Sequence, residues 1–366
     1  MLSIEKIGDS SPPLARGSVD EPLRNDSRNC APALVADLCC GMGGLSLAAL
    51  QLGMRVAVGV DVNVEVARTF RNNFPDAEFV QGSVRSVKVL RRCSELLEAR
   101  NGPSAPSIIV SGPPCQGFSA AGSRNPVDPR NQILVAVARA IAEIRPRCAL
   151  VENVSTVLLR KYSDRLSTFE KTLAEAGYSV QGVLLDASDF GVAQKRRRAF
   201  FLITPTALDK NDLQGRLDQL KQPELSAETV LRGLPRPQVR PDRYDDEAYC
   251  GTVANHLAMR HSKRVMDKIA ALKPGTGPMS YRRLNLSGPS KTLFSGHRAP
   301  PAHFREPRSI TVREAARLQG FPDSFRVYGS FANQMEQVTN AVPPPLAKSV
   351  LQVLAELADI STITHA

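Results

Sequence analysis

Along the first part of the chain, short apolar runs alternate with segments of helical periodicity. Residues 34–38 form an apolar run that ends in the glycine turn 41–44, and residues 45–52 continue as a helix. The same alternation predicts strands at 56–60, 108–110, 149–151, 180–185 and 200–203, and a helix at 133–144. Strands that alternate with helices predict a doubly wound α/β sheet.

The pattern changes after residue 204. The stretches 234–243 and 273–289 are rich in Pro, Gly and Arg and show little periodicity, whereas residues 312–319 and 346–357 again predict helices. We therefore expect four parts along the chain: a loose tail at 1–30, the α/β domain at 31–203, a second, loop-rich domain at 204–332, and a segment at 333–358 that packs back on the first domain.

The glycine turn lies where an α/β sheet binds ligands, beyond the carboxyl end of a strand. Asp61 ends the next strand, 20 residues after Gly41, and is placed to meet a ribose hydroxyl. Ser46 stands where a dinucleotide fingerprint would have its third glycine. These residues indicate a nucleotide-like cofactor and leave its type open.

A thiol is held at the same edge of the sheet. The sequence Gly-Pro-Pro-Cys-Gln-Gly-Phe-Ser at 112–119 follows a buried strand, and its two prolines stiffen the loop that carries Cys115. A fixed thiol at a ligand-binding edge is a candidate nucleophile. The simpler interpretation, a buried apolar cysteine, suits Cys93 and Cys148 better.

A carboxylate and a basic run complete the candidate chemistry. Glu152 follows the strand at 149–151, so it would protrude near Cys115. A lone Glu at a strand end is usually solvated or ion-paired, and a basic run such as residues 194–198 usually faces solvent or phosphate. One guanidinium turned inward could instead orient the carboxylate and a substrate.

Charge favours a polyanionic partner. The chain has 47 Lys and Arg against 36 Asp and Glu, a formal charge of +11, although a merely basic soluble protein would look the same. The seven cysteines form no Cys-x-x-Cys pair, so we expect no metal site and a reducing compartment. We expect no membrane span, because no segment has the ~18 uninterrupted apolar residues that one needs.

Six blocks, taken in their order, resemble the DNA cytosine-5 methyltransferase family of bacterial and phage type. They are the loop from Asp37 to Gly44, the Pro-Pro-Cys loop, Glu152-Asn153-Val154, Gln194 to Arg198, and the blocks at 311–323 and 337–344. The resemblance covers nearly everything from Ala36 to Val353. It implies a Rossmann-like sheet that binds S-adenosylmethionine, with a smaller target-recognition domain at about 204–308.

The resemblance also implies residue roles. Cys115 would add to C6 of a flipped-out cytosine, Glu152 would engage N3, and Arg196 and Arg198 would support the base and the carboxylate. The residues expected to bind the cofactor are Asp37, Cys39, Gly41, Gly43, Gly44, Asp61, Ser83, Pro114, Asn340 and Ala341. Those expected to contact DNA are Gln116, Ser119 and Gln194, with Arg282, Arg283, His297, Arg298 and His303 as candidates for base readout.

Three positions depart from the family's usual pattern. Cys39 stands in place of an aromatic residue against the adenine, and Ser83 replaces an acidic residue that accepts the adenine amino group. Thr339 replaces the glycine before Asn340, which would cost backbone freedom if φ there were positive.

Three other functions fit parts of the sequence. An RNA (tRNA) cytosine-5 methyltransferase of the same family would share the nucleophile and carboxylate blocks. A catalytically silent DNA-binding regulator could keep the fold, although it would not need Cys115, Glu152, Arg196 and Asn340 together. A nicotinamide-dependent dehydrogenase has no use for the Pro-Pro-Cys loop.

By analogy with the family, we expect a monomer that acts on double-stranded DNA in the bacterial cytosol or nucleoid. It would belong to a restriction-modification system, with a cognate endonuclease that acts separately, or it would be a solitary or phage methylase.

Overall fold

The computed structural model describes residues 32–101, 107–114, 132–240, 253–278, 281–294, 300–360 and 362. All of them belong to one compact unit, Ala31–Ala366. The predictions made for the tail at 1–30 and for Cys115, Gln116, Ser119, His297 and Arg298 lie outside the described residues.

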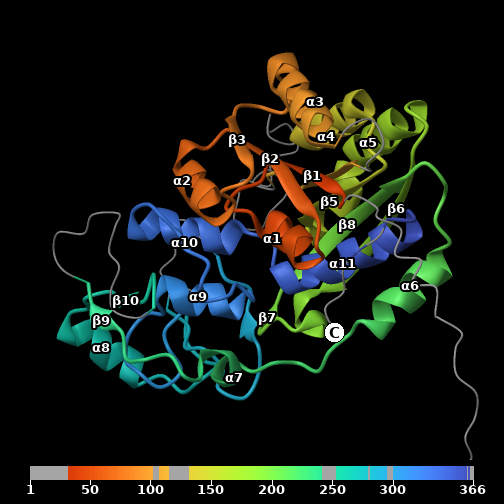
Figure 1. Ribbon diagram of the computed structural model, residues 1–366. Helices are drawn as coiled ribbons and strands as arrows, with labels where there is room; N and C mark the ends of the chain where they lie inside the picture. The colour runs from red at the N-terminus through yellow and green to blue at the C-terminus, as the bar shows by residue number, and fades with distance from the viewer. Residues whose placement is uncertain are drawn as a thin grey trace, which may run out of the picture. The chain divides into compact units, whose positions relative to one another are not determined.

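Within the described residues, seven strands form one sheet in the order β3-β2-β1-β4-β5-β8-β6 (Figure 1). All pairs are parallel except those of β8, which runs antiparallel to both of its neighbours. The bounds are β1 (Leu34–Leu38), β2 (Arg55–Asp61), β3 (Glu78–Gln81), β4 (Ser107–Ser111), β5 (Cys148–Val154), β6 (Ser179–Asp186) and β8 (Arg197–Thr204). The predicted doubly wound α/β sheet is confirmed.

Helices cover both faces of this sheet, because the central strands are apolar on both sides. In β1, Leu34, Ala36 and Leu38 join one hydrophobic cluster and Val35 joins the other. The first cluster includes residues of α3 (Val87–Asn101), α4 (Ile133–Ile144) and α5 (Ser163–Glu175). The second includes residues of α1 (Gly44–Gln51), α2 (Val64–Asn73) and α11 (Pro344–Leu357), together with helices from later in the chain. Figure 1 shows α3, α4 and α5 together on one side of the sheet.

The stretch after β8 contains short elements joined by long loops, as expected. Its helices are α6 (Lys210–Gln219), α7 (Ala227–Leu231), α8 (Lys263–Ala270), α9 (Val312–Leu318) and α10 (Phe331–Asn340), and its strands are β9 (Gln238–Val239), β10 (Leu257–Ala258) and β11 (Ser290–Lys291). Between β5 and β8 lie η3 (Ser155–Leu158), η4 (Arg160–Tyr162), η5 (Ala187–Phe190) and β7 (Gln194–Lys195), and β7 pairs with β11.

Helix α9 begins with a capping box, in which the Thr311 side chain accepts a hydrogen bond from the N–H of Glu314 and the Glu314 carboxylate accepts one from the N–H of Thr311. This cap is why the helix predicted at 312–319 begins at Val312. The guanidinium of Arg313 is buried and donates to backbone carbonyls of Ala254 and Pro322, which ties α9 to the loops around it.

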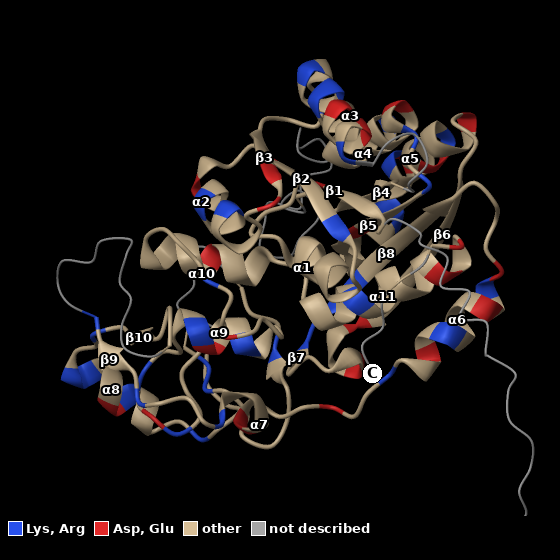
Figure 2. Cartoon of the chain, viewed as in Figure 1, with Lys and Arg blue, Asp and Glu red and all other residues tan. Residues whose placement is uncertain are grey.

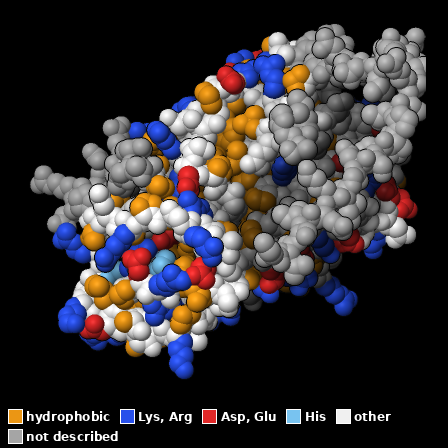
Figure 3. Space-filling view, turned by 60° about the horizontal axis from the view of Figure 1, so that its bottom comes forward, with side chains coloured by type: hydrophobic (Ala, Val, Ile, Leu, Met, Phe, Trp, Pro, Cys, Tyr) orange, Lys and Arg blue, Asp and Glu red, His pale blue; other side chains and the backbone are white. Residues whose placement is uncertain are grey.

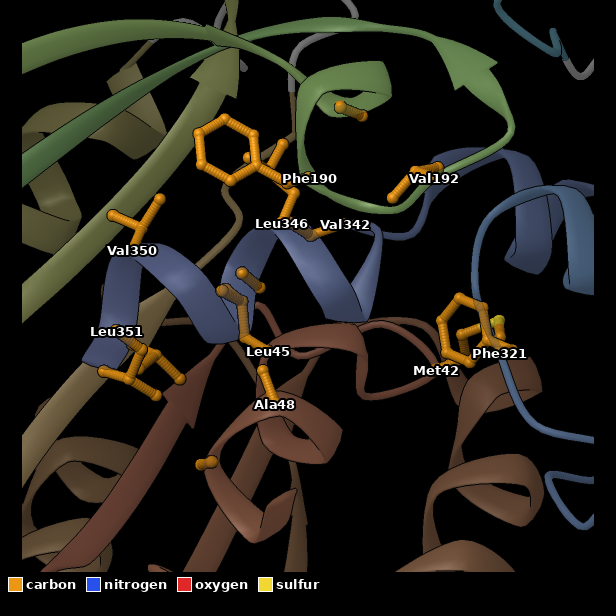
Figure 4. Close-up of a cluster of buried hydrophobic side chains, with 14 of the residues drawn as sticks. Met42, Leu45, Ala48, Phe190, Val192, Phe321, Val342, Leu346, Val350 and Leu351 are labelled. Carbon is orange, nitrogen blue, oxygen red and sulfur yellow. The ribbon is translucent and has the colours of Figure 1, made fainter. Parts of the chain in front are cut away.

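Helix α11, which covers most of the predicted helix at 346–357, packs against elements from the first part of the chain. It lies between α1 and the turn of η5, with Leu346 and Val350 near Phe190 and Leu45 on the opposite side (Figure 4). The approach to α1 is close, because a Cβ atom at Gly44 would lie 2.2 Å from the carbonyl oxygen of Val342. Among the described residues, no helix is both long and apolar enough to cross a membrane.

Candidate active site

A cavity of about 910 Å³ lies along the carboxyl ends of the parallel strands. Its wall includes residues at or just beyond the ends of five neighbouring strands, from β3 to β5: Ser83, Asp61, Cys39, Gly112 and Glu152. Four strand spacings of about 4.8 Å make this row roughly 19 Å long. The chain reverses its winding between β1 and β4, so the middle of the cavity is the switch point at which such sheets bind ligands.

The glycine turn forms the wall beside β1 and β2. Gly43 has φ +97°, and a Cβ atom there would lie 2.2 Å from the Phe74 ring, so only glycine fits. The N–H of Gly41 donates to Asp61 Oδ2 at 2.9 Å, and the N–H of Asn63 donates to Asp61 Oδ1 at 2.8 Å. Asp61 therefore fixes the turn while its carboxylate lines the cavity.

Asp37 lies behind this turn, fully buried, and is not part of the cavity wall. Its Oδ2 accepts a hydrogen bond from Ser46 Oγ at 2.6 Å, and within the described residues its Oδ1 has no hydrogen-bond partner. Burial, only partly offset by the bonds from Ser46, raises the pKa of Asp37 from 3.8 to about 7. Ser46, which stands where a dinucleotide fingerprint has glycine, therefore serves to hold this carboxyl group.

Cys39 and Ser83 both line the cavity. Cys39 has φ +64°, a conformation that L residues rarely adopt, and burial raises the pKa of its thiol, so it stays neutral. The Oγ of Ser83 accepts the N–H of Arg85 at 3.2 Å, which holds the turn after β3.

The end of α10 forms the opposite wall. Thr339, Asn340 and Ala341 all line the cavity. Thr339 lies inside the helix and is not among the residues with positive φ, so the strain considered for a glycine replacement does not arise. Arg196 donates from Nη2 to the Ala341 carbonyl at 3.1 Å, which ties this wall to the basic run.

Glu152 lies within β5, on its cavity side, and only 7% of the residue is exposed. Arg198 occupies the neighbouring strand β8 two residues from the direct partner of Glu152, and its Nε contacts Glu152 Oε1 at 2.7 Å. Burial raises the pKa of Glu152, while Arg198 and then Arg196 act to lower it. Burial thus favours the protonated carboxyl group, whereas the two arginines favour the ionised carboxylate.

The start of the Pro-Pro-Cys loop enters the same cavity. Gly112, Pro113 and Pro114 line it, and a Cβ atom at Gly112 would lie 3.8 Å from Glu152 Oε2. Asn153 Nδ2 donates to the Pro113 carbonyl at 3.4 Å, so β5 supports the loop two residues before Cys115. The structure therefore brings the root of this loop and the carboxyl group of Glu152 together.

Most residues of the basic run 194–198 line the cavity, and one is buried away from it. Residues 195–198 line the cavity, but Gln194 is fully buried outside it, and its Oε1 accepts the N–H of Leu293 at 3.2 Å. Thr292 Oγ1 also donates to the Lys195 carbonyl at 2.7 Å. Gln194 thus anchors the segment after β11 against the site and does not itself face the cavity.

Two candidates for base readout are interior residues. Arg283 is buried and donates to the carbonyls of His303, Leu272 and Arg305. His303 is also buried, and its Nδ1 accepts the N–H groups of Arg305 and Glu306. Their expected role in base readout is therefore wrong, because both side chains are committed to holding loops. Arg282 is half-buried and donates to the Gly277 carbonyl.

Sequence reasoning missed several residues that shape the site. Asn153 belongs to a quoted block, and Ser46 was noted only as a departure from a dinucleotide fingerprint. Neither was assigned its bond, to Pro113 and to Asp37 respectively. Thr292, Leu293 and Phe294 line the cavity from a stretch without periodicity, so no local pattern could have indicated them. Among the described residues, no group of His, Cys, Asp or Glu is placed to hold a metal ion.

The sheet, the glycine turn and the buried Glu152 at one cavity are typical of α/β proteins that bind a nucleotide-like cofactor. Comparison with known proteins narrows this class. The model of the C-5 cytosine-specific DNA methylase family matches residues 34–356. The chain therefore belongs to that family of methyltransferases.

Individual relatives agree. The chain is 29% identical over 352 residues to the type II methyltransferase M1.HphI of Haemophilus parahaemolyticus. The aligned region covers 90% of this chain and 88% of that protein. It is 32% identical over 332 residues to M.AplI of Arthrospira platensis, covering 87% and 84%. A crystal structure of a candidate DNA modification methyltransferase encoded within an E. coli prophage matches with a TM-score of 0.72 and 27% identity, over 89% of this chain and 99% of that one.

Proposed function

We propose that this chain is a DNA (cytosine-5)-methyltransferase that flips a cytosine out of duplex DNA and methylates C5 with S-adenosylmethionine, through a covalent Cys115 adduct. The observation that carries the proposal is the placement of Glu152, whose buried carboxyl group shares one cavity with the glycine turn and with the root of the loop that leads to Cys115. Family membership supports the same reaction.

The residues beside β1, β2 and β3 fit S-adenosylmethionine. Asp61 keeps carboxylate lone pairs beyond its two bonds to backbone N–H groups, as a ribose contact needs. Gly112 lines the same cavity, and a Cβ atom there would be in ordinary van der Waals contact with Val342, Glu152 and Leu45 at 3.5–3.9 Å. The other proposed contacts are Cys39, Gly41, Gly43, Gly44, Ser83, Pro114, Asn340 and Ala341, while Asp37 acts from behind the turn. When bound there, S-adenosylmethionine supplies an electrophilic methyl group.

The reaction needs activation of the base, because an aromatic cytosine carbon is a weak nucleophile. The thiolate of Cys115 forms a bond to C6, and the C5–C6 π pair becomes a C4–C5 double bond. The former C4–N3 π pair is taken up at N3, which leaves C5 as the nucleophilic carbon of an enamine. Glu152 donates a proton or a strong hydrogen bond to N3, which stabilises the charge that develops on the ring. After C5 is methylated, loss of its proton and departure of Cys115 restore the double bond.

Burial suits Glu152 to this task, because it raises the pKa of the carboxyl group and so favours the protonated form. Arg198 keeps the group oriented through its 2.7 Å contact, and Arg196 links the same region to Ala341. Both arginines are therefore proposed to support the base and the carboxyl group.

Methylation at C5 requires the base to leave the stacked duplex, at a cost of a few kcal/mol. A chain with a formal charge of +11 attracts the phosphate backbone, which offsets part of that cost. We propose that residues 204–332 form the target-recognition domain and that Gln116 and Ser119 contact DNA. Helix α8, within this stretch, carries Lys and Arg positions, which are coloured blue in Figure 2.

The relatives M1.HphI and M.AplI are type II methyltransferases, which supports a role in a restriction-modification system or as a solitary methylase. A cognate endonuclease would then act as a separate protein. We propose a monomer that works on DNA in the bacterial cytosol or nucleoid.

Bisulfite sequencing tests the proposal. DNA from cells that express the chain should show protected cytosines within one short sequence, and cells that express Cys115→Ser should show none. Methylation of tRNA with unmodified DNA would favour the RNA-directed function instead. Protection that persists in Cys115→Ser would contradict the assigned nucleophile.

A further inference from the structure

A short extended segment, residues 325–328, lies between helix α2 and the loop-rich part of the chain. We call it the bridging segment. It leads through Gly329 into α10, the helix whose end forms one wall of the cavity. Its backbone is bonded on both edges by side chains that are far away in the sequence.

Helix α2 bonds the first edge. Asn73 Nδ2 donates to the Arg326 carbonyl at 2.7 Å, and the Arg326 N–H donates to Asn73 Oδ1 at 3.0 Å. One turn earlier on the helix, Thr69 Oγ1 accepts the N–H of Tyr328 at 2.9 Å. The amide of Asn73 thus replaces the backbone of a neighbouring strand.

Asn255 bonds the other edge. The Val327 N–H donates to Asn255 Oδ1 at 3.0 Å, and Asn255 Nδ2 donates back to the Val327 carbonyl at 2.6 Å. The same Nδ2 is 2.9 Å from Gln334 Oε1, inside α10. Residues 326 and 328 therefore face α2 while residue 327 faces Asn255, the alternation of a strand between two partners.

The bridging segment is connected to the cavity wall. Gln337 Nε2 donates to the Tyr328 carbonyl at 2.7 Å, and Asn333 Nδ2 donates to Glu65 Oε2 at 2.8 Å. Gln337, Asn333 and Glu65 all line the cavity. A shift of the segment would therefore move α10 relative to α2 at the end of the cavity that β2 and β3 form.

We propose that Asn73 and Asn255 are positioning residues that hold α10 against α2 and thereby keep the cofactor half of the cavity closed. The inference rests on the proposed function, because it assumes that S-adenosylmethionine occupies this half. The bonds between Asn73 and Arg326 are exposed, so their loss frees the segment without unfolding the chain.

The test compares Asn73→Ala with Asn211→Ala, a change at an exposed position on α6, in the full-length protein. Calorimetry measures the Kd of S-adenosylhomocysteine, and a methyl-transfer assay on plasmid DNA measures KM for S-adenosylmethionine and kcat. We expect Asn73→Ala to raise Kd and KM about tenfold, the size of one or two net hydrogen bonds, with kcat within about twofold of the wild type. Asn211→Ala should change none of these values.

A merely structural role would give a different result. General destabilisation lowers the fraction of active enzyme, so kcat would fall while KM stayed constant, and that outcome or unchanged constants would overturn the inference. If Asn73→Ala does not fold, Thr69→Val removes the acceptor for Tyr328 with little change in shape and should give the same rise in KM. A wild-type chain that does not bind S-adenosylhomocysteine would instead contradict the proposed function.

Discussion

The burial and the charged neighbour of Glu152 both follow from its position within β5. The sequence placed it just after residues 149–151, but β5 continues to Val154, so Glu152 pairs with β8 and is buried. Only the antiparallel pairing brings Arg198 within 2.7 Å of it, and no local pattern contains that pairing. The sequence therefore indicated which residues take part, whereas their environment came from the fold.

Glu152→Gln tests this residue directly. The amide can donate a hydrogen bond to N3 but cannot transfer a proton, so we expect methyl transfer to fall by about 10²–10⁴-fold. The Kd of S-adenosylhomocysteine should stay within about twofold, because Glu152 lies at the β5 end of the cavity. Activity within tenfold of the wild type, in a folded variant, would argue against an acid role.

Asp37 makes the stability depend on pH. Burial raises its pKa from 3.8 to about 7, so between these values the folded chain binds a proton more tightly than the unfolded chain. The free energy of unfolding should therefore fall as pH rises through this window, by at most about 4 kcal/mol at roughly 1.4 kcal/mol per pKa unit.

Urea unfolding at pH 5 and pH 8 measures this effect. We expect Asp37→Asn to flatten the difference between the two values, while Asp164→Asn, at an exposed position at the start of α5, keeps the wild-type difference. An Asp37→Asn chain with the full wild-type pH dependence would show that another group is responsible.

At the scale of elements, the contact between α1 and α11 joins the two ends of the fold. The sequence predicted both helices from their apolar periodicity, and Pro343 and Pro344 mark where α11 begins. It could not predict how closely they approach, because that depends on Gly44 meeting the Val342 carbonyl, nearly 300 residues away. Residues 292–294 could not be placed for the same reason, since only the pairing of β11 with β7 brings them to the cavity.

Gly44→Ala tests this contact. The added methyl group would lie 2.2 Å from the Val342 oxygen, so the backbone before α11 must move. We expect a loss of about 1–3 kcal/mol in the free energy of unfolding and weaker binding of S-adenosylhomocysteine. Gly215→Ala, in α6 with no atom within 4 Å of the new Cβ, should be neutral or stabilise by up to about 1 kcal/mol. Equal effects of the two substitutions would contradict the packing described.

At the scale of the whole molecule, the net positive charge favours binding to the phosphates of a nucleic acid, whereas the fold forms the cavity. Figure 3 shows Lys and Arg side chains spread over the visible face, and the formal charge of +11 describes the entire chain. Such a distribution favours binding to phosphates without indicating which bases are read.

Salt dependence measures the electrostatic contribution. The logarithm of the association constant for duplex DNA should fall linearly with the logarithm of salt concentration, with a slope of about 0.9 per phosphate contacted. Replacing Lys263 and Lys268 of α8 by Gln should reduce the slope by up to about one for each lysine that contacts phosphate, and leave the Kd of S-adenosylhomocysteine unchanged. Fluorescence anisotropy measures the association constants at about 50 to 200 mM salt, the range in which the salt effect is large. A slope that neither substitution alters would exclude α8 from the DNA contact.

The central claim is that Cys115 and Glu152 act on one cytosine, and a covalent trap tests it most directly. DNA synthesised with 5-fluorocytosine retains fluorine at C5, so the enzyme cannot be released after methyl transfer. With S-adenosylmethionine, the wild type and Cys93→Ser should form a complex that survives denaturing electrophoresis, and Cys115→Ser should form none. An adduct that persists in Cys115→Ser, or methylation by the wild type without any adduct, would contradict the account.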